Sequence, residues 1–429
     1  MYWIVALIFV MIVIFILFSS YPPIGNGRRY VPSGRLNDRL RTKSILEPGD
    51  GRRTFCDASL ERRSGLYVLR LKGAPYEMGF QHGVLLREEI RRGALLYHAG
   101  SVDNFAPFNQ KSDFVRWLLK KYFDWTIYRP LFRNAPKDYL TEIKGLADGC
   151  GLPFDVVFRG NMLSEFNMNT AKLTKQAMLK RLQSGECTSF AAFGSNTPDG
   201  KVIMGRNTDY SGAGLWDKYQ TVMFYEPQDG HRFVNVGTAG LLKCNSCMNE
   251  KGLCLGGHFL YSDDVKANGV GFTALELEIM KKSGSIEQAY AIVRKYARAG
   301  AFGYLLVDGR RNEAAVVEAC ANHVGLRLSE KERICETNFM TTTELKPVDI
   351  LIKHGVGRNP LARYRRMLEL IDENPGSITP QKAAMFMGDH KDLCSNSVRP
   401  FGMCPATLAN LTSAVFHPEC FDFWVADGL

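Results

Sequence analysis

Two patterns of hydrophobic and polar positions divide the chain near residue 187. Before it, a strand-like run at 66–73 is followed by segments with the pattern of helices, at 75–99, 112–126 and 136–149. After it, short apolar runs bounded by turn residues predict strands at 187–196, 200–210, 221–227, 231–240, 252–260, 303–309 and 313–319. Further helices are expected at 284–300, 360–374 and 379–390. Strand series broken by paired helices predict an α+β protein in which helices cover sheets.

Two of the later helices begin with residues that favour a helix start. Ser285 stands three residues before Gln288, which is the spacing of a capping box. Thr379 precedes Pro380, so a threonine N-cap with proline at the first helical position is expected there.

The first residues form an uncharged apolar run at 2–18, "YWIVALIFVMIVIFILF". A helix needs roughly 17–25 apolar residues to span a bilayer, so this run is long enough. No Lys or Arg precedes it and "SSYPP" is a poor cleavage site, so we expect an uncleaved anchor at 1–20 rather than a signal peptide. The basic residues follow the run, which favours a cytoplasmic body by the positive-inside rule, with an exported body as the alternative.

The composition of the chain changes this picture little. Residues 21–63 are rich in Pro, Gly and Arg and are expected to form a basic linker. The chain has 429 residues, of which 45% are hydrophobic and 23% charged, a globular balance. Its net charge of +10 comes without an aromatic-interleaved basic motif, so nucleic acid is not an expected partner.

The 11 cysteines are irregularly spaced and do not form the disulfide framework of a small secreted domain. Most are expected to be buried thiols. Cys244 and Cys247 form a Cys-x-x-Cys pair, which leaves a redox protein open as one alternative function. The pair lacks the strand-then-helix setting of a redox motif and a second pair at zinc spacing, so no metal is expected there.

The candidate chemistry lies at residues 185–210, "GECTSFAAFGSNTPDGKVIMGRNTDY". Cys187 begins a predicted strand, and a Thr-Pro-Asp-Gly turn returns the chain so that Arg206 and Asp209 come back beside it. If the bond between Glu186 and Cys187 is cut, the new α-amino group has a pKa of about 7.7–8.0 and can accept the thiol proton. The alternative is a buried structural cysteine beside a surface Arg–Asp pair.

Seven segments, in register along the chain, resemble one known family. Besides the hairpin they are "GAPYEMGFQHG" (73–83), "EIKGLADGCGLPFDVVFRGNM" (142–162), "CMNEKGLCLGGH" (247–258), "ETNFM" (336–340), "NPLARYRRMLEL" (359–370) and the ending from "GDHKDL" (388–429). The chain resembles the N-terminal-nucleophile hydrolase superfamily over residues 64–429. Within that superfamily it is similar to the peptidase C45-like family of acyl-coenzyme A:6-aminopenicillanic acid acyltransferase (isopenicillin N acyltransferase).

The resemblance implies a four-layer αββα sandwich with a mostly helical N-terminal segment. It also implies self-cleavage before Cys187, so that a pro-segment or small subunit at 64–186 stays associated with a catalytic region at 187–429. Phe339 stands where the family usually has His. Glu186 stands where a small residue is common, and a bulky acid at the strained peptide would slow the cleavage.

Residue roles follow from the same resemblance. Cys187 would be the nucleophile and, through its freed amine, the base. Arg206 and Asp209 match an Arg-x-x-Asp spacing shared with bile-salt hydrolases and acid ceramidase. Asn338 matches the oxyanion-hole asparagine, and Arg363 matches an arginine of a late helix and is expected to bind substrate.

Three further residues have alternative interpretations. Asn249 could line the substrate site, although a turn residue is the alternative. His82 and His258 are expected to be structural, because no partner for either can be identified from the sequence.

The expected function is that of a membrane-anchored cysteine amidohydrolase or acyltransferase that works through an acyl-cysteine without metal or organic cofactor. The substrate would be a small N-acyl amide or acyl thioester, and the anchor favours a lipid-like one. The alternative of another class is a catalytically silent, membrane-tethered binding protein with the same fold.

Overall fold

The structure of the chain is a computed structural model. It describes residues 24–32, 40, 42–46, 51–105, 108–171, 187–210, 214–400, 402–407 and 409–427. No helix among these residues combines the length and the apolar character that a bilayer crossing needs. The expected anchor at 1–20 lies outside the described residues, as does Glu186, so both expectations remain predictions.

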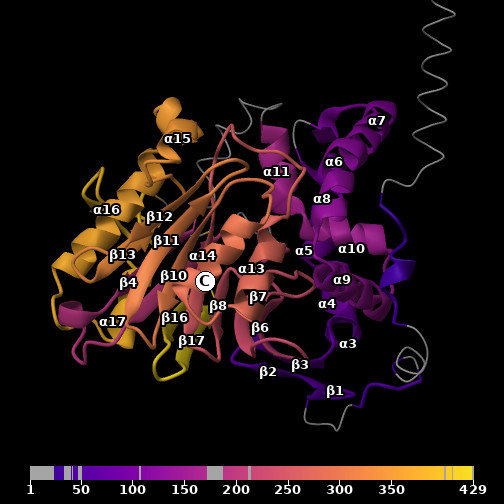
Figure 1. Ribbon diagram of the computed structural model, residues 1–429, viewed down its shortest axis with the longest axis horizontal. Coiled ribbons are helices and arrows are strands. Elements are labelled where there is room, and N and C mark those ends of the chain that lie inside the picture. Colours follow the sequence, from indigo (N-terminus) through magenta and orange to yellow (C-terminus); the bar gives the residue numbers. More distant parts are fainter. Residues whose placement is uncertain are drawn as a thin grey trace, which may run out of the picture.

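The strands form two large sheets and one small ribbon (Figure 1). The ten-stranded sheet has, in order of pairing, β1 (Arg53–Phe55), β2 (Ala58–Arg63), β3 (Leu66–Gly73), β6 (Gln220–Pro227), β7 (Phe233–Thr238), β8 (Ser246–Asn249), β9 (Leu253–Phe259), β10 (Phe302–Asp308), β11 (Glu313–Ala319) and β12 (Val324–Leu328). The five-stranded sheet has β13 (Arg333–Glu336), β4 (Thr188–Ala192), β5 (Ile203–Asp209), β16 (Asn410–His417) and β17 (Asp422–Asp427). The ribbon pairs β14 (Lys391–Asp392) with β15 (Ser397–Val398). Both large sheets are antiparallel except where β3 and β6 pair in parallel.

The helices fall into an early and a late group. The early group has α3 (Pro75–Leu85), α4 (Arg87–Arg92), α5 (Ala94–Ala99), α6 (Ser101–Asn104), α7 (Asp113–Phe123), a π-helical turn η3 (Asp124–Tyr128), α8 (Arg129–Asn134), α9 (Lys137–Cys150), α10 (Phe154–Asn161) and α11 (Leu163–Ala171). The late group has α13 (Phe272–Lys282), α14 (Ile286–Lys295), α15 (Ile350–Lys353), α16 (Arg358–Asp372) and α17 (Pro380–Met387). Short 3₁₀ turns are η1 (Arg28–Tyr30), η2 (Phe108–Gln110), η4 (Gly194–Asn196) and η5 (Lys346–Val348). The expected N-caps are confirmed, since Ser285 accepts from the Gln288 N–H and Thr379 from the Lys382 N–H.

Three hydrophobic clusters lie between four layers of the fold. Successive side chains of one strand point to opposite faces of its sheet and so enter different clusters. On β10, Leu305 and Val307 point into the cluster between the two sheets, whereas Tyr304 and Leu306 face the cluster shared with α13, α14 and the early helices. On β4, Ala191 points between the sheets, and Phe190 and Ala192 pack against α16 and α17. The order helix, sheet, sheet, helix confirms the expected αββα sandwich (Figure 1).

Two expectations about the early region are corrected. The helix expected at 75–99 is three helices, because the chain turns at Leu86 and again at Gly93, whose backbone is extended. The expected linker at 21–63 is not a free linker throughout: β1 and β2 begin the large sheet, and Tyr30 packs between the rings of Phe132 and Phe154. A composition rich in Pro, Gly and Arg conceals these few buried residues.

The expected boundary before Cys187 does not separate two folding units. Strand β3 pairs with β6 across that boundary, and a buried ion pair of 2.8 Å joins Glu142 of α9 to Lys281 of α13. A hydrogen bond also crosses the boundary, since the Asn161 side chain accepts from the Leu242 N–H at 2.6 Å. The two parts therefore share one sheet and one core.

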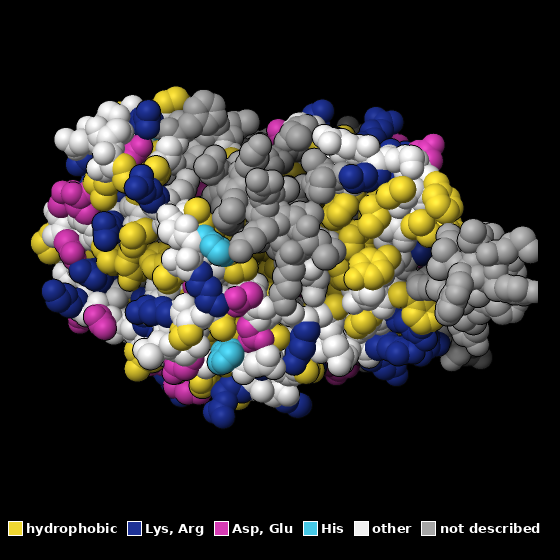
Figure 2. Space-filling model, turned by 90° about the horizontal axis from the view of Figure 1, so that it is seen from above, with side chains coloured by type: hydrophobic (Ala, Val, Ile, Leu, Met, Phe, Trp, Pro, Cys, Tyr) yellow, Lys and Arg dark blue, Asp and Glu magenta, His cyan; other side chains and the backbone are white. Residues whose placement is uncertain are grey.

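Helix α7 has an apolar face that the rest of the described chain leaves exposed. Phe114, Leu118 and Tyr122 follow one another at four-residue spacing, and they are 60%, 42% and 49% exposed. Figure 2 shows hydrophobic side chains gathered on the right of the face seen from above, the side on which Figure 1 draws α7. Apolar patches of this kind mark interaction sites.

Candidate active site

The predicted hairpin is present and carries the candidate nucleophile at its start. Strands β4 and β5 pair with Thr188 opposite Asn207 and Ser189 opposite Arg206, and Cys187 precedes β4 directly. Arg206 and Asp209 are both buried, with 0% and 3% exposure. The alternative interpretation of a surface Arg–Asp pair is therefore wrong.

Arg363 joins three residues that lie far apart in the sequence. Its Nη1 donates to the Cys187 carbonyl at 2.7 Å and to the Thr188 hydroxyl at 2.8 Å, and its Nη2 donates to Asn338 Oδ1 at 3.1 Å. Asn359, one turn earlier on α16, accepts from its Nε at 2.7 Å and so orients the guanidinium. Cys187 is half-buried, whereas Arg363 is 1% exposed. The structure thus brings Cys187, Asn338 and Arg363 to one point at the start of β4.

Asn338 has hydrogen-bonding capacity left at this point. One N–H of its amide donates to the Phe259 carbonyl at 2.9 Å, while its oxygen accepts from Arg363. A primary amide has two N–H donors, so a second one can bind a substrate oxygen. This is the capacity that an oxyanion-hole residue needs.

Arg206 braces the two sheets against each other. Its guanidinium donates to the backbone carbonyls of Asn245 at 3.0 Å and Asn207 at 2.6 Å, and to that of Gly257. Strand β9 approaches closely there, since a Cβ at Gly256 would lie 2.7 Å from the end of the Met204 side chain and 3.1 Å from Arg206 Cδ. Arg206 thus places a fixed positive charge inside the sandwich beneath the hairpin.

The two candidate structural histidines are both neutral and buried. His258 Nε2 lies 2.6 Å from the Ser189 hydroxyl. Burial, with the charges of Arg206 and Arg363, holds its pKa well below the usual value. His82 accepts from the Gly240 N–H at 2.9 Å, and burial lowers its pKa to about 3. His82 has the contacts of a structural residue, whereas His258, on β9, contacts Ser189, two residues after the candidate nucleophile.

Sequence reasoning missed Lys243 and Glu276. Burial lowers the pKa of Lys243, whose charge interacts with Glu276 and with Cys187, and its ammonium lies 4.7 Å from the Trp216 ring centre. Burial raises the pKa of Glu276, which accepts from the Cys244 N–H at 2.9 Å. The only sequence signal for this pair is a single lysine in the otherwise uncharged stretch at 233–249.

Of the other predicted residues, Asp209 lies two positions after Asn207, the partner of Thr188, and so at the same end of the hairpin as Cys187. Asp209 ends β5, opposite Asn410 of β16. Asn249 has every amide position in use: its Nδ2 donates to the Met280 and Ser283 carbonyls, and its Oδ1 accepts from the N–H groups of residues 251 and 253. These are the contacts of a turn residue, the alternative that the sequence left open.

The arrangement suits a nucleophile that needs positive charge around it. A thiolate is favoured by neighbouring cations and partial exposure. Cys187 is partly exposed, its carbonyl accepts from Arg363, and it interacts with the charge of Lys243. The carbonyl of Cys187 is fixed by Arg363, so the thiol and the main chain at the start of β4 have a defined orientation.

Comparison with known proteins identifies a family and several similar chains. The family described as acyl-coenzyme A:6-aminopenicillanic acid acyl-transferase matches residues 195–426, more than half of the chain. The match begins after Cys187, so the resemblance of the earlier segments remains a prediction.

An uncharacterised protein of Archaeoglobus fulgidus is 25% identical over 275 residues, 62% of this chain and 45% of its own length. Protein dcd1A of Dictyostelium discoideum is 26% identical over 254 residues, 52% of this chain and 51% of its own. The chain spans about half the length of these curated relatives.

Two solved structures are also similar to the chain. The N-acylethanolamine-hydrolyzing acid amidase ortholog of Caenorhabditis elegans has a TM-score of 0.41 at 12% identity. The matched region covers 56% of this chain and 100% of the chain in that structure. A mutant conjugated bile acid hydrolase of Clostridium perfringens has a TM-score of 0.40 at 16% identity and covers 56% of this chain and 89% of its own.

Proposed function

Because the chain belongs to the acyl-coenzyme A:6-aminopenicillanic acid acyl-transferase family, we propose that it transfers or hydrolyses acyl groups through an acyl-cysteine at Cys187. The substrate is an N-acyl amide or an acyl thioester, and the acceptor is water or an amine. One observation carries the assignment: the Arg363 guanidinium contacts Cys187, Thr188 and Asn338 at once. A nucleophile, a cation and a free amide donor meet there, as acyl transfer requires.

The reaction has two steps. The Cys187 sulfur attacks the acyl carbon, and the bond to the leaving amine or thiol breaks as that group takes up a proton. Water or an amine then attacks the thioester, and the sulfur leaves as thiolate. In both steps the carbonyl oxygen becomes negatively charged, and the second N–H of Asn338 is the proposed donor to it.

The base in this proposal is the α-amino group of Cys187, released by cleavage after Glu186. His258 does not fill the role readily, because burial and two arginine charges disfavour its protonated form. After cleavage the fragments would stay together, since β3 pairs with β6 and the Glu142–Lys281 ion pair is buried between them.

The lipid-like character of the substrate is proposed from two apolar features. Residues 2–18 are apolar and uncharged, which is the basis for the proposed membrane anchor. Helix α7 exposes Phe114, Leu118 and Tyr122 beside Arg116 and Lys120, the composition of a helix that lies on a bilayer. A double substitution Phe114→Ser/Leu118→Ser should slow turnover of a substrate held in vesicles and leave turnover of a water-soluble acyl thioester unchanged. Equal effects on both substrates would contradict the membrane role.

Mass spectrometry of the purified full chain tests the function. After a mixture of N-acyl amides and acyl-coenzyme A thioesters is added, a rapid quench should reveal one acyl group on Cys187. N-terminal sequencing should find a second fragment that begins at this cysteine. Active protein that contains only the intact chain would contradict the amine base. Binding of acyl ligands without an adduct or turnover would favour the silent binding protein.

A further inference from the structure

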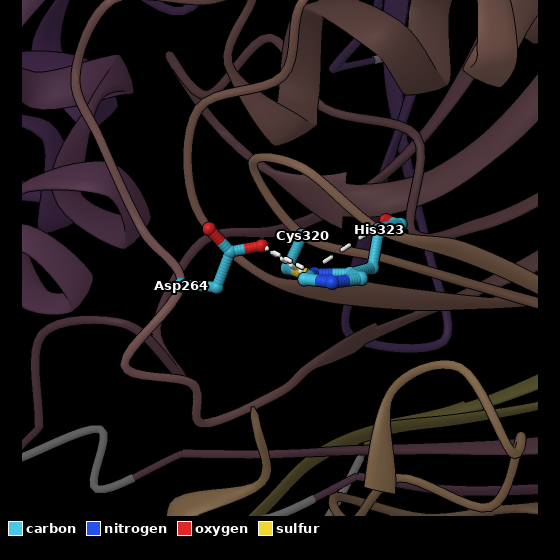
Figure 3. A group of neighbouring side chains, drawn as sticks. All are labelled: Asp264, Cys320 and His323. Atoms are coloured by element: carbon cyan, nitrogen blue, oxygen red, sulfur yellow. Dashed lines mark hydrogen bonds and ion pairs between the residues drawn. The ribbon is translucent and has the colours of Figure 1, made fainter. Parts of the chain in front are cut away.

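Three side chains of metal-binding type converge on one point outside the Cys187 site. Asp264 Oδ2 lies 2.8 Å from Cys320 Sγ and 2.9 Å from His323 Nδ1, and 3.7 Å separates Sγ from Nδ1. Figure 3 shows the carboxylate, the thiol and the imidazole turned toward one another. It is the only group of this kind found among the described residues.

Local structure holds two of the ligands on one tight turn. Cys320 directly follows β11 and His323 directly precedes β12, so the sequence there is Cys-Ala-Asn-His. The Cys320 N–H donates to the His323 carbonyl at 2.9 Å and closes the turn. Both side chains therefore leave the same side of the turn, in a Cys-x-x-His spacing like that of zinc-binding loops.

The third ligand is fixed by hydrogen bonds to the same turn. Asp264 lies in the loop between β9 and α13, and its Oδ2 accepts from the Asn322 backbone N–H at 2.9 Å. Its Oδ1 accepts from the Asn322 side chain, and its carbonyl accepts from the Ala321 N–H at 3.0 Å. Metal ligands are commonly oriented by such outer hydrogen bonds.

The cluster is reachable from solvent. Cys320 is fully buried and the Asp264 side chain is 12% exposed, whereas the His323 side chain is 46% exposed. An ion can approach past the imidazole and reach the thiol beneath it.

The ligand set selects the ion. Thiolate, imidazole and carboxylate together suit Zn²⁺, whereas Mg²⁺ and Ca²⁺ prefer oxygen ligands alone. Zinc bond lengths of about 2.3 Å to sulfur and about 2.0 Å to nitrogen or oxygen imply ligand separations of roughly 3.3–3.6 Å. The 3.7 Å between Sγ and Nδ1 fits this geometry, and the carboxylate must withdraw by roughly half an ångström.

We propose that Asp264, Cys320 and His323 bind one Zn²⁺ ion, with water as the fourth ligand. On binding, the Cys320 thiol loses its proton to solvent, and the neutral His323 ring coordinates through Nδ1 with its proton on Nε2. The ion clamps the β9–α13 loop to the β11–β12 turn. That loop leaves β9 at Phe259, whose carbonyl holds Asn338. The ion would therefore fix this loop close to Asn338, the proposed oxyanion donor.

Cobalt titration of the full chain tests the site, because a Co²⁺–thiolate bond gives a charge-transfer band in the near ultraviolet. We expect a band that saturates at one equivalent and is displaced by Zn²⁺. His323→Ala, at an exposed position, should weaken binding by at least about tenfold, and Cys320→Ala should remove the band. Zn²⁺ should raise the melting temperature of the unmodified chain and leave that of His323→Ala unchanged.

Cys420→Ala is the matched control. Cys420 Sγ and Asp199 Oδ2 each lie 3.9 Å from His417 Nε2, so the same three residue types are present there without converging. This variant, and a Cys187→Ala variant, should keep both the band and the zinc stabilisation. No band in the unmodified chain, or undiminished affinity in His323→Ala, would overturn the proposal.

Discussion

Cys187 and the Cys244–Cys247 pair lie in contrasting surroundings. Cys187 is half-buried at the start of the small sheet, and its carbonyl is held by a guanidinium. Cys244 and Cys247 are fully buried beside the large sheet. Burial raises the pKa of both, and the nearby carboxylate of Glu276 adds to this effect.

The contrast indicates that charge and access, rather than sequence motif, separate the proposed nucleophile from the buried pair. A thiolate needs positive charge and partial exposure, and only Cys187 of these three has both. The Cys-x-x-Cys spacing attracts attention in the sequence, yet burial next to carboxylates disfavours thiolate chemistry there.

The largest effect is expected from Cys187→Ala. Loss of the nucleophile should lower kcat by roughly 10³–10⁶-fold, as removal of a central catalytic residue does in other enzymes. The fold should persist, because the side chain is only half-buried. Turnover of an acyl thioester and a melting curve, measured on the same preparation, check both parts. A variant with normal turnover would place the chemistry elsewhere.

A smaller loss is expected from Asn338→Ala. Removing one oxyanion donor typically costs about 10²–10³ in kcat, with KM little changed. Asn338→Asp is a useful companion, because it keeps an oxygen for Arg363 but lacks the donor. Both variants should lose kcat per titrated acyl-cysteine site. If Asn338 only held the loop in place, Asn338→Ala would melt earlier while its folded fraction turned over normally.

How much of this site the sequence predicts depends on the distance between partners along the chain. The hairpin from Cys187 to Asp209 could be predicted because its turn residues and apolar runs are local. The contact between Arg363 and the Cys187 carbonyl spans 176 positions. No local pattern encodes such a contact, and only the family resemblance suggested that this arginine belongs near the site.

The same limit applies to the fold. Helix N-caps at Ser285 and Thr379 were predictable, since capping depends on neighbouring residues. Lys243 was not, because its position over the Trp216 ring and near the charge of Glu276 results from packing of separate elements. The close approach of α3 to α9, where a Cβ at Gly79 would lie 2.0 Å from the Glu142 carbonyl, was not predictable from a local pattern either.

The buried carboxyl group of Glu165 predicts that the stability of the fold depends on pH. Glu165 interacts with Glu276, and burial raises its pKa from 4.5 to about 7. Between these values the folded state binds more protons than the unfolded state, so stability falls as pH rises from 4.5 to 7. This difference in pKa corresponds to roughly 3 kcal/mol of unfolding free energy.

Glu165→Gln tests this effect without changing the shape of the side chain. Its amide oxygen can still accept from the Phe272 N–H, as the carboxylate does at 2.6 Å. Relative to the unmodified chain, the variant should become more stable as the pH rises from 4.5 to 7. Above pH 8 the difference in unfolding free energy should stay constant. Parallel curves throughout would show that Glu165 ionises normally in the folded protein.

The smallest effect is expected from the double substitution Cys244→Ala/Cys247→Ala. If the pair is only packed, kcat per titrated site should stay within about twofold, and each lost sulfur should cost about 1 kcal/mol of stability. The unmodified chain and the double variant should each turn over equally fast in reductant and in a mild oxidant that leaves Cys187 unmodified. The reason is that buried thiols of raised pKa react slowly. A redox role would give the opposite result, with turnover that responds to oxidant in the unmodified chain and is lost in the double variant.

The Cys244 main chain, not its sulfur, donates to Glu276. Alanine therefore leaves the Lys243–Glu276 pair in place, and any loss of turnover would have to come from the thiols themselves.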